Sequence, residues 1–231
     1  MKNSNGILKL TVLSMLVALG VVISPILRVE GMCPMAHFIN IVCSVFMGPW
    51  YSLLCATLIG IIRMATMGIP PLALTGAVFG AFLSGVFYRM SKGKIICAVV
   101  GEVIGTGIIG AIVSGLSWMF YVPSFICGTL IGGSIAYVFL RKIASNGMLT
   151  KLQLKLNSTS YTDKSTVLSD SLTIAAFGAI LFVVIKIASN IFKLTGSIWN
   201  ILAYAAPGVC VAAAIIYYVI KKVKTKDAAH C

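Results

Sequence analysis

Long apolar runs dominate this sequence and constrain its fold more than any other feature. The stretch of residues 33–63 is almost wholly apolar, and Gly48-Pro49 interrupts it near its middle. Only 10% of the chain is charged and 59% is hydrophobic, whereas soluble domains are about one-quarter charged. A soluble fold of this length cannot bury so much apolar surface, and the runs lack the alternation of strands. The sequence therefore predicts an all-α integral membrane protein.

Eight apolar segments, separated by turns and polar stretches, predict eight membrane spans. We expect a six-span unit at 1–143, a polar cytoplasmic linker at 144–168, and two additional C-terminal transmembrane helices with a basic tail at 169–231. The spans are expected at 7–27, 37–48, 50–64, 72–88, 95–115, 124–140, 171–191 and 198–220, with an aromatic turn at 118–123. The second span, at about 18 Å, is shorter than the ~30 Å hydrocarbon core. Backbone at membrane depth must be buried or line a cavity, so this short span indicates a pocket.

The basic residues are distributed unevenly between the loops. With the N-terminus inside, 14 of the 18 Lys and Arg residues fall on the inner side, which is the positive-inside pattern. The chain is therefore expected in the cell membrane as a multi-pass protein with both termini cytoplasmic. The same pattern accounts for the net charge of +13 without nucleic-acid binding.

Catalytic and metal-binding patterns are missing from the sequence. The seven cysteines form no CxxC pair and no cluster with histidine at metal spacing, so no metal site, cofactor or disulfide framework is expected. There is no P-loop and no Ser/His/Asp pattern, and an enzyme is not expected. The run of residues 105–110 matches G-x-G-x-x-G, but it lies inside a span, where close helix packing explains it better.

A few polar side chains inside the spans are the candidate substrate-binding residues. His37 and Asn40 are three residues apart and therefore share one helix face. Glu102 is the one acidic residue within the first six spans, and Thr106 follows it on the same face. A membrane carboxylate must be paired, protonated or in water. Arg63 either contributes to the pocket, pairs structurally or reaches the outer headgroups; His37 has the alternative of capping its helix.

Several motifs in the first two-thirds of the chain resemble the ThiW family. They are Ser24-Pro25, Cys33-Pro34-x-x-His37-x-Ile39-Asn40, Met47-Gly48-Pro49-Trp50-Tyr51, Ile61-Ile62-Arg63, Thr75-Gly76-Ala77 and the run from Gly101-Glu102 to Gly110-Ala111. The resemblance covers about residues 8–143. It implies a substrate-capture S component of an energy-coupling factor (ECF) transporter for a thiamine precursor of the hydroxyethylthiazole type.

The resemblance also implies partners and further site residues. An S component docks on a transmembrane T component driven by two ATPase subunits, and it uses small residues of its first helix to do so. Ser14 and Ala18, which are four apart and suit close helix approach, are the expected docking residues. Thr75 joins the expected substrate-binding set. Ala36, Met64 and the run of residues 74–77 are less polar than the family pattern, which favours a different or less polar heterocycle.

Two other classes of function remain open at this point. A self-sufficient secondary carrier or channel for a small neutral solute is the alternative, because eight spans are enough helices for transport alone. The sparse membrane charge weighs against ion coupling, since ion paths usually need more than one carboxylate. A membrane scaffold without transport activity is the third reading.

Overall fold

The computed structural model describes the helical part of the chain in two compact units. The described residues are 2–25, 33–70, 72–113, 118–156, 158 and 197–227, together with single positions between 171 and 185. Unit 1 comprises Met1–Asp163 and unit 2 comprises Lys164–Cys231. All the regular secondary structure of the described residues is helical, so the prediction of an all-α fold is confirmed.

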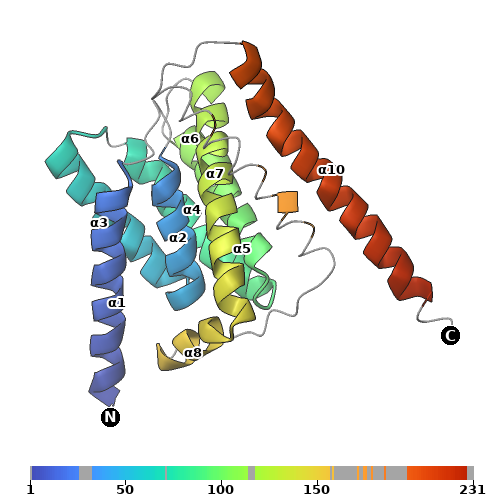
Figure 1. The fold of residues 1–231 in the computed structure, drawn as a ribbon. Coiled ribbons are helices and arrows are strands. Elements are labelled where there is room, and N and C mark those ends of the chain that lie inside the picture. Colours follow the sequence, from blue (N-terminus) through green and yellow to red (C-terminus); the bar gives the residue numbers. More distant parts are fainter. Residues whose placement is uncertain are drawn as a thin grey trace. The chain divides into compact units, whose positions relative to one another are not determined.

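Unit 1 is a bundle of helices that run up and down in sequence order (Figure 1). Pro34 and Pro49 each occupy the first turn of a helix, where a missing N–H costs nothing. Gly48 joins these two helices with a positive φ of 94°. The long helices are α1 (Lys2–Ile23), α2 (Pro34–Met47), α3 (Pro49–Met67), α4 (Leu72–Met90), α5 (Ile95–Glu102), which continues as η1 (Val103–Gly110) and α6 (Ala111–Val113), and α7 (Trp118–Ser145).

The lengths and composition of these helices fit a membrane. Five helical segments of the described chain are long and apolar enough to cross one: Gly6–Ile23, Pro49–Met67, Ile95–Val113, Val122–Ser145 and Tyr204–Lys222. The shorter apolar segments Pro34–Met47 and Leu74–Met90 complete the bundle of unit 1. As the sequence predicts, the second span is short.

The prediction of an aromatic turn at residues 118–123 is wrong. Trp118 begins α7, and Pro123 lies inside the helix rather than ending the turn before it. Pro is tolerated in membrane helices because neighbouring helices and local adjustments satisfy the backbone groups that it frees. Helix α7 therefore extends from Trp118 to Ser145, further at both ends than the span predicted at residues 124–140.

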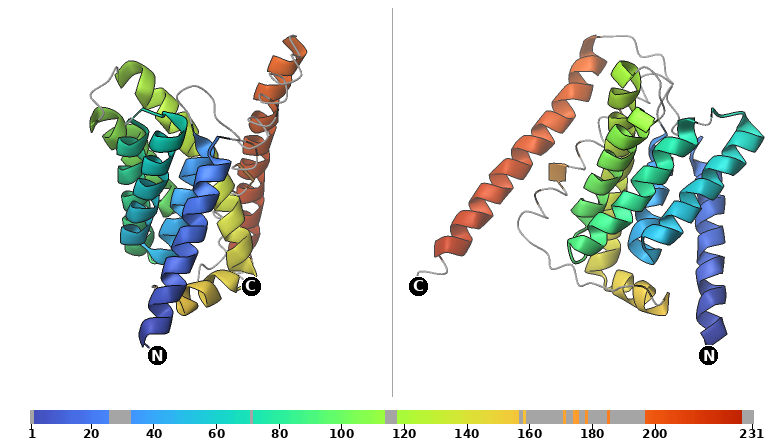
Figure 2. Two further views of the ribbon diagram at one scale, coloured as in Figure 1. Left: turned by 90° about the vertical axis from the view of Figure 1, so that its left-hand side faces the viewer. Right: turned by 180° about the vertical axis from the view of Figure 1, so that it is seen from behind.

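The segment that we expected to be a polar linker contains a helix, α8 (Met148–Lys155). It lies across the end of the bundle at which the N-terminus is found, as Figure 1 and both views of Figure 2 show. Leu149, Gln153 and Leu156 are buried, so one face of α8 packs onto unit 1. The sequence did not predict this helix because its composition is polar and only Leu149 and Gln153 of α8 are buried, with Leu156 directly after it.

Unit 2 contains the long apolar helix α10 (Ser197–Asp227), which includes the span predicted at 198–220. The span predicted at 171–191 lies almost wholly outside the described residues. Gly178 lies against Pro207 and Cys210 of α10, since a Cβ on Gly178 would be 2.6 Å from Cys210 Cβ. The domain boundaries at 143 and 168 stay predictions.

Candidate functional site

Helix α2 carries the first two candidate residues into the interior of unit 1. His37 and Asn40 lie one turn apart, and both are buried, with 7% and 1% of their surfaces exposed. Ser52 of α3 donates a hydrogen bond from its hydroxyl to the Asn40 carbonyl oxygen at 2.9 Å. Asn40 is therefore held from α3 as well as by its own helix.

Glu102, at the end of α5, is the centre of the candidate site. It is fully buried, and its Oε1 atom lies 2.9 Å from His37 Nδ1, 3.1 Å from Asn40 Nδ2 and 3.4 Å from Thr106 Oγ1. The amide of Asn40 and the hydroxyl of Thr106 donate to this oxygen, and the imidazole does so from Nδ1 when Glu102 is ionised. Four of the six predicted substrate-binding residues thus meet at one carboxylate.

The second oxygen of Glu102 distinguishes this site from an ordinary buried ion pair. Glu102 Oε2 is buried and has no hydrogen-bond partner among the described residues. Leaving a buried charged acceptor unsatisfied costs more than the ~1–3 kcal/mol of a neutral group. The three donors on Oε1 fix the plane of the carboxylate. The arrangement can therefore bind a hydrogen-bond donor of a small solute at Oε2.

A π-helix positions Thr106 and the glycines around Glu102. Helix η1 follows Glu102 directly, and π-helical turns occur often at functional sites. Gly101, Gly105 and Gly110 face Ser84, Gly80 and Gly76 of α4, because added Cβ atoms would lie 2.5–2.9 Å from the Cα atoms of those residues. The three glycines are separated by four and then five residues along α5 and η1, whereas the residues that they face on α4 are separated by four and four. The wider π turn supplies the extra residue.

Because Gly80 has no side chain, the side chains of Glu102 and Thr106 can pack against its backbone. A Cβ on Gly80 would overlap Thr106 Oγ1 and would lie 3.0 Å from Glu102 Oε1. Close packing therefore accounts for the glycine-rich run of residues 105–110, as the sequence predicts. Gly107 contributes on its other side, where a Cβ would lie 2.7 Å from Ile126 Cγ1 of α7.

Arg63 is buried, with 6% of its surface exposed, and it does not pair with Glu102. Its Nη2 atom donates to Cys33 Sγ at 3.1 Å, and the Cys33 thiol donates to the Ser24 carbonyl oxygen at 3.1 Å. This chain of contacts ties the ends of α1, α2 and α3 together. Arg63 Nε is buried without a hydrogen-bond partner among the described residues, so it is a second group that a solute can satisfy.

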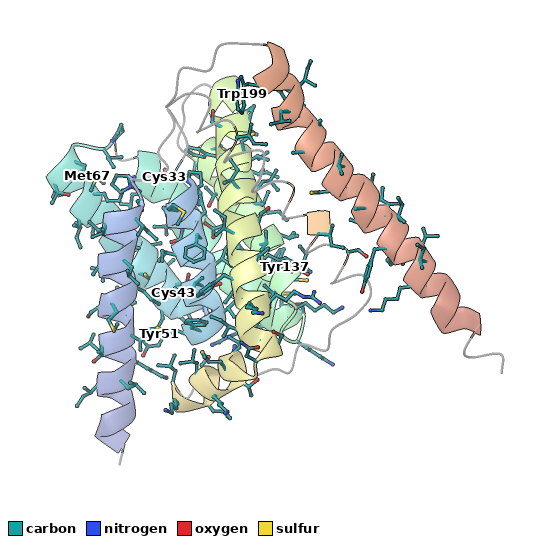
Figure 3. All side chains as sticks on the ribbon, viewed as in Figure 1. Cys33, Cys43, Tyr51, Met67, Tyr137 and Trp199 are labelled. Carbon is teal, nitrogen blue, oxygen red and sulfur yellow. The ribbon has the colours of Figure 1, made fainter. Side chains whose placement is uncertain are left out.

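The depth of the site can be located along the helices of unit 1. Figure 3 shows Cys33 near the end of the bundle at which Met67 lies, and Tyr51 nearer the opposite end. His37 is one turn of α2 further into the bundle than Cys33. A Cβ on Gly132, midway along α7, would lie 3.0 Å from His37 Cβ, so the candidate groups lie near the middle of the bundle.

The remaining predicted residues lie elsewhere in unit 1. Thr75 is half-buried on α4, next to Gly76, whose Cβ would lie 3.4 Å from Thr106 Cγ2. Ser14 and Ala18 are exposed on α1, and the Ser14 hydroxyl donates to the Leu10 carbonyl oxygen of its own helix at 2.9 Å. Their roles in solute binding and partner docking stay predictions.

Sequence reasoning missed three residues that build the site. Cys33 holds Arg63, Ser52 holds Asn40, and Gly80 makes space for Thr106. The four-residue spacing of Gly76, Gly80 and Ser84 was a usable signal, because it marks one close-packing face of a helix. No comparable signal identifies the partner of Arg63. Among the described residues, no three His, Cys, Asp or Glu side chains are grouped as metal ligands.

Comparison with known proteins adds one finding. The family model described as thiamine-precursor transporter protein (ThiW) matches residues 10–146, which is more than half of the chain. No curated protein and no solved structure matches the sequence. The matched region contains most of the helical bundle of unit 1 and the three residues that contact the Glu102 carboxylate. The chain therefore belongs to the ThiW family of thiamine-precursor transporter proteins.

Proposed function

We propose that this chain is the substrate-capture S subunit of an ECF-type importer, and that it binds hydroxyethylthiazole or a related small heterocycle. The observation that carries the proposal is the buried Glu102 carboxylate, whose Oε1 receives three side-chain contacts while Oε2 has no hydrogen-bond partner in the described part of the chain. A solute with one hydrogen-bond donor and an otherwise apolar ring satisfies that oxygen. The family match supports transport of a thiamine precursor.

The apolar surroundings of the carboxylate favour a ring compound over a sugar or an amino acid. Most of the buried residues of α2 are apolar, among them Ile39, Ile41 and Val42, so few polar groups share the interior of the bundle with the carboxylate. Binding sites of this kind use apolar walls for affinity and a small number of polar groups for orientation. Glu102 Oε2 accepts from the solute and Arg63 Nε donates to it in the proposed complex.

The partners follow from the proposed class of transporter. The sequence contains no nucleotide-binding P-loop, so the energy for uptake comes from two ATPase subunits coupled through a T component.

Native mass spectrometry of the purified chain is expected to detect a co-purifying thiazole. Uptake by cells is expected to stop when the ATPase subunits are deleted, and uptake that continues without them would contradict the ECF assignment.

A self-sufficient carrier is the second candidate, favoured by the buried contact between His37 and Glu102. The two groups are 2.9 Å apart and can share or exchange a proton, which is a means of coupling transport to a gradient. The candidate predicts gradient-driven uptake by proteoliposomes that contain this chain alone. Proteoliposomes that bind the solute but do not accumulate it would instead support the capture subunit.

A further inference from the structure

Helix α8 presents a face of mixed basic and apolar character away from the bundle. Lys151 and Lys155 are exposed, and so are Met148 and Leu154, with 52% and 63% of their surfaces exposed. Positions 148, 151 and 155 follow helical spacing, and residue 154 adjoins them on the same side. We call these four residues the α8 face. Basic residues beside exposed apolar side chains are typical of helices that lie in a membrane interface.

A buried amide fixes the rotation of α8 about its own axis. Gln153 is fully buried, and its Nε2 donates to the Val45 carbonyl oxygen of α2 at 2.8 Å and to the Tyr88 hydroxyl of α4 at 3.1 Å. Val45 lies in the last turn of α2, where carbonyl groups lack intrahelical partners. Because Gln153 must point into the bundle, Lys151 and Lys155 must point away from it.

The described residues around the α8 face carry basic charge. Glu102 is the sole acidic residue of the sequence between positions 33 and 158, and it is fully buried in the bundle. Other basic residues lie at the same end of unit 1, in the turn after α4 and in the last turns of α4 and α7. They are Arg89, Lys92, Lys94, Arg141 and Lys142. The α8 face therefore complements a negatively charged surface.

We propose that the α8 face is a docking surface for the headgroups of anionic phospholipids. Helix α8 lies across the end of the bundle of unit 1 (Figure 1), so a membrane spanned by that bundle brings lipid headgroups close to α8. Leu154 and Met148 enter the boundary between headgroups and acyl chains, and the two ammonium groups contact lipid phosphates. The inference concerns lipid at the α8 end of unit 1 and does not depend on which solute the chain carries.

Native mass spectrometry of the full chain in detergent tests the proposal, with phosphatidylglycerol and phosphatidylcholine of matched acyl chains as probes. The wild-type chain is expected to bind phosphatidylglycerol at least tenfold more tightly than phosphatidylcholine. The double substitution Lys151→Gln and Lys155→Gln is expected to lower phosphatidylglycerol affinity by about thirtyfold, since each basic residue near an anionic surface contributes about fivefold.

Lys92→Gln with Lys94→Gln is the matched control, because both residues are exposed at the same end and the charge change is identical. This pair is expected to lower phosphatidylglycerol affinity by less than fivefold, because its lysines act on the headgroup only through longer-range charge, whereas Lys151 and Lys155 contact it in the proposed complex. Equal binding of the two lipids by the wild-type chain would overturn the proposal, and so would equal losses from the two double variants. Neither measurement involves solute, so the result is independent of any failure of the proposed transport function.

Discussion

At the scale of single residues, the defining feature is the Glu102 carboxylate, whose two oxygens differ in their hydrogen-bond contacts. One oxygen of Glu102 has contacts from three side chains on two segments, and the other has none among the described residues. The sequence predicted these four residues as candidates because polar groups in membrane spans are costly and usually functional. It did not predict that His37, rather than Arg63, contacts Glu102, because pairing depends on how α2 and α5 pack.

Asn40→Ala tests whether the oriented carboxylate is needed for solute binding. The substitution removes the 3.1 Å hydrogen bond to Glu102 Oε1. Hydrogen bonds to charged groups contribute about 1.5–3 kcal/mol, so we expect thiazole affinity to fall by roughly 10-fold to 100-fold. Equilibrium dialysis with labelled thiazole measures the loss. Thr57→Val is the control, since Thr57 donates to Leu53 of its own helix, and it is expected to leave affinity unchanged.

Arg63→Lys tests the contribution of the guanidinium. Lysine keeps the positive charge but has no counterpart of the buried Nε, and it lacks the planar fork that reaches Cys33. We expect at least a tenfold lower affinity for the thiazole with the helical content retained, as measured by circular dichroism. Wild-type affinity in this variant would show that Arg63 serves the fold rather than the solute.

At the scale of elements, the register between α4 and the helix that faces it positions Glu102 and Thr106. The π turn of η1 brings Gly110, rather than Ile109, against Gly76. The sequence indicated close packing through its glycines. It did not indicate the π turn. Ile109 and Gly110 are both apolar, so the hydrophobic pattern does not reveal which of the two faces Gly76.

Gly80→Ala tests this packing directly. The added methyl group would overlap Thr106 Oγ1 and press on Glu102, so both must move. Overpacking of this kind typically costs about 1–3 kcal/mol, and we expect a lower melting temperature together with weaker thiazole binding. Gly208→Ala is the matched control, because no atom lies within 4 Å of its added Cβ. A melting temperature lowered equally by both substitutions would contradict the packing account.

Gln153→Ala tests the attachment of α8 to the bundle. The substitution removes the hydrogen bonds to Val45 and Tyr88 and leaves the Val45 carbonyl oxygen without this donor. An unsatisfied buried polar group costs about 1–3 kcal/mol, so we expect a lower melting temperature and faster amide exchange in α8. Lys151→Ala, an exposed position on the same helix, is expected to change neither quantity.

At the scale of the whole molecule, the sequence predicted the class of fold and most of the helix boundaries. Apolar runs separated by Gly, Pro and basic turns sufficed for that, because every membrane span must satisfy its own backbone. The helical stretch from Trp118 to Pro123 and helix α8 were not predicted. In both cases local composition resembled a turn or linker, and for α8 the burial of Leu149 and Gln153 against the rest of unit 1 accounts for the helix.

The expected topology is tested by labelling introduced cysteines with a membrane-impermeant maleimide in intact cells. Met67→Cys lies at the end of α3 nearest Arg63 and is expected to be labelled from outside. Lys92→Cys lies in the turn after α4 and is expected to be labelled only after the cells are lysed. The unsubstituted chain gives the background from native cysteines. The reverse pattern of labelling would contradict the expected orientation and place the α8 end outside.

The most direct test of the central claim is the affinity of purified wild-type and Glu102→Gln chains for hydroxyethylthiazole, measured by isothermal titration calorimetry. Glutamine keeps the size of the side chain but removes the negative charge and replaces one carboxylate oxygen with an amide nitrogen. The wild-type chain is expected to bind one molecule of solute, and Glu102→Gln is expected to bind at least tenfold more weakly. Equal affinities in two equally stable proteins would contradict the claim that the free oxygen of Glu102 holds the solute.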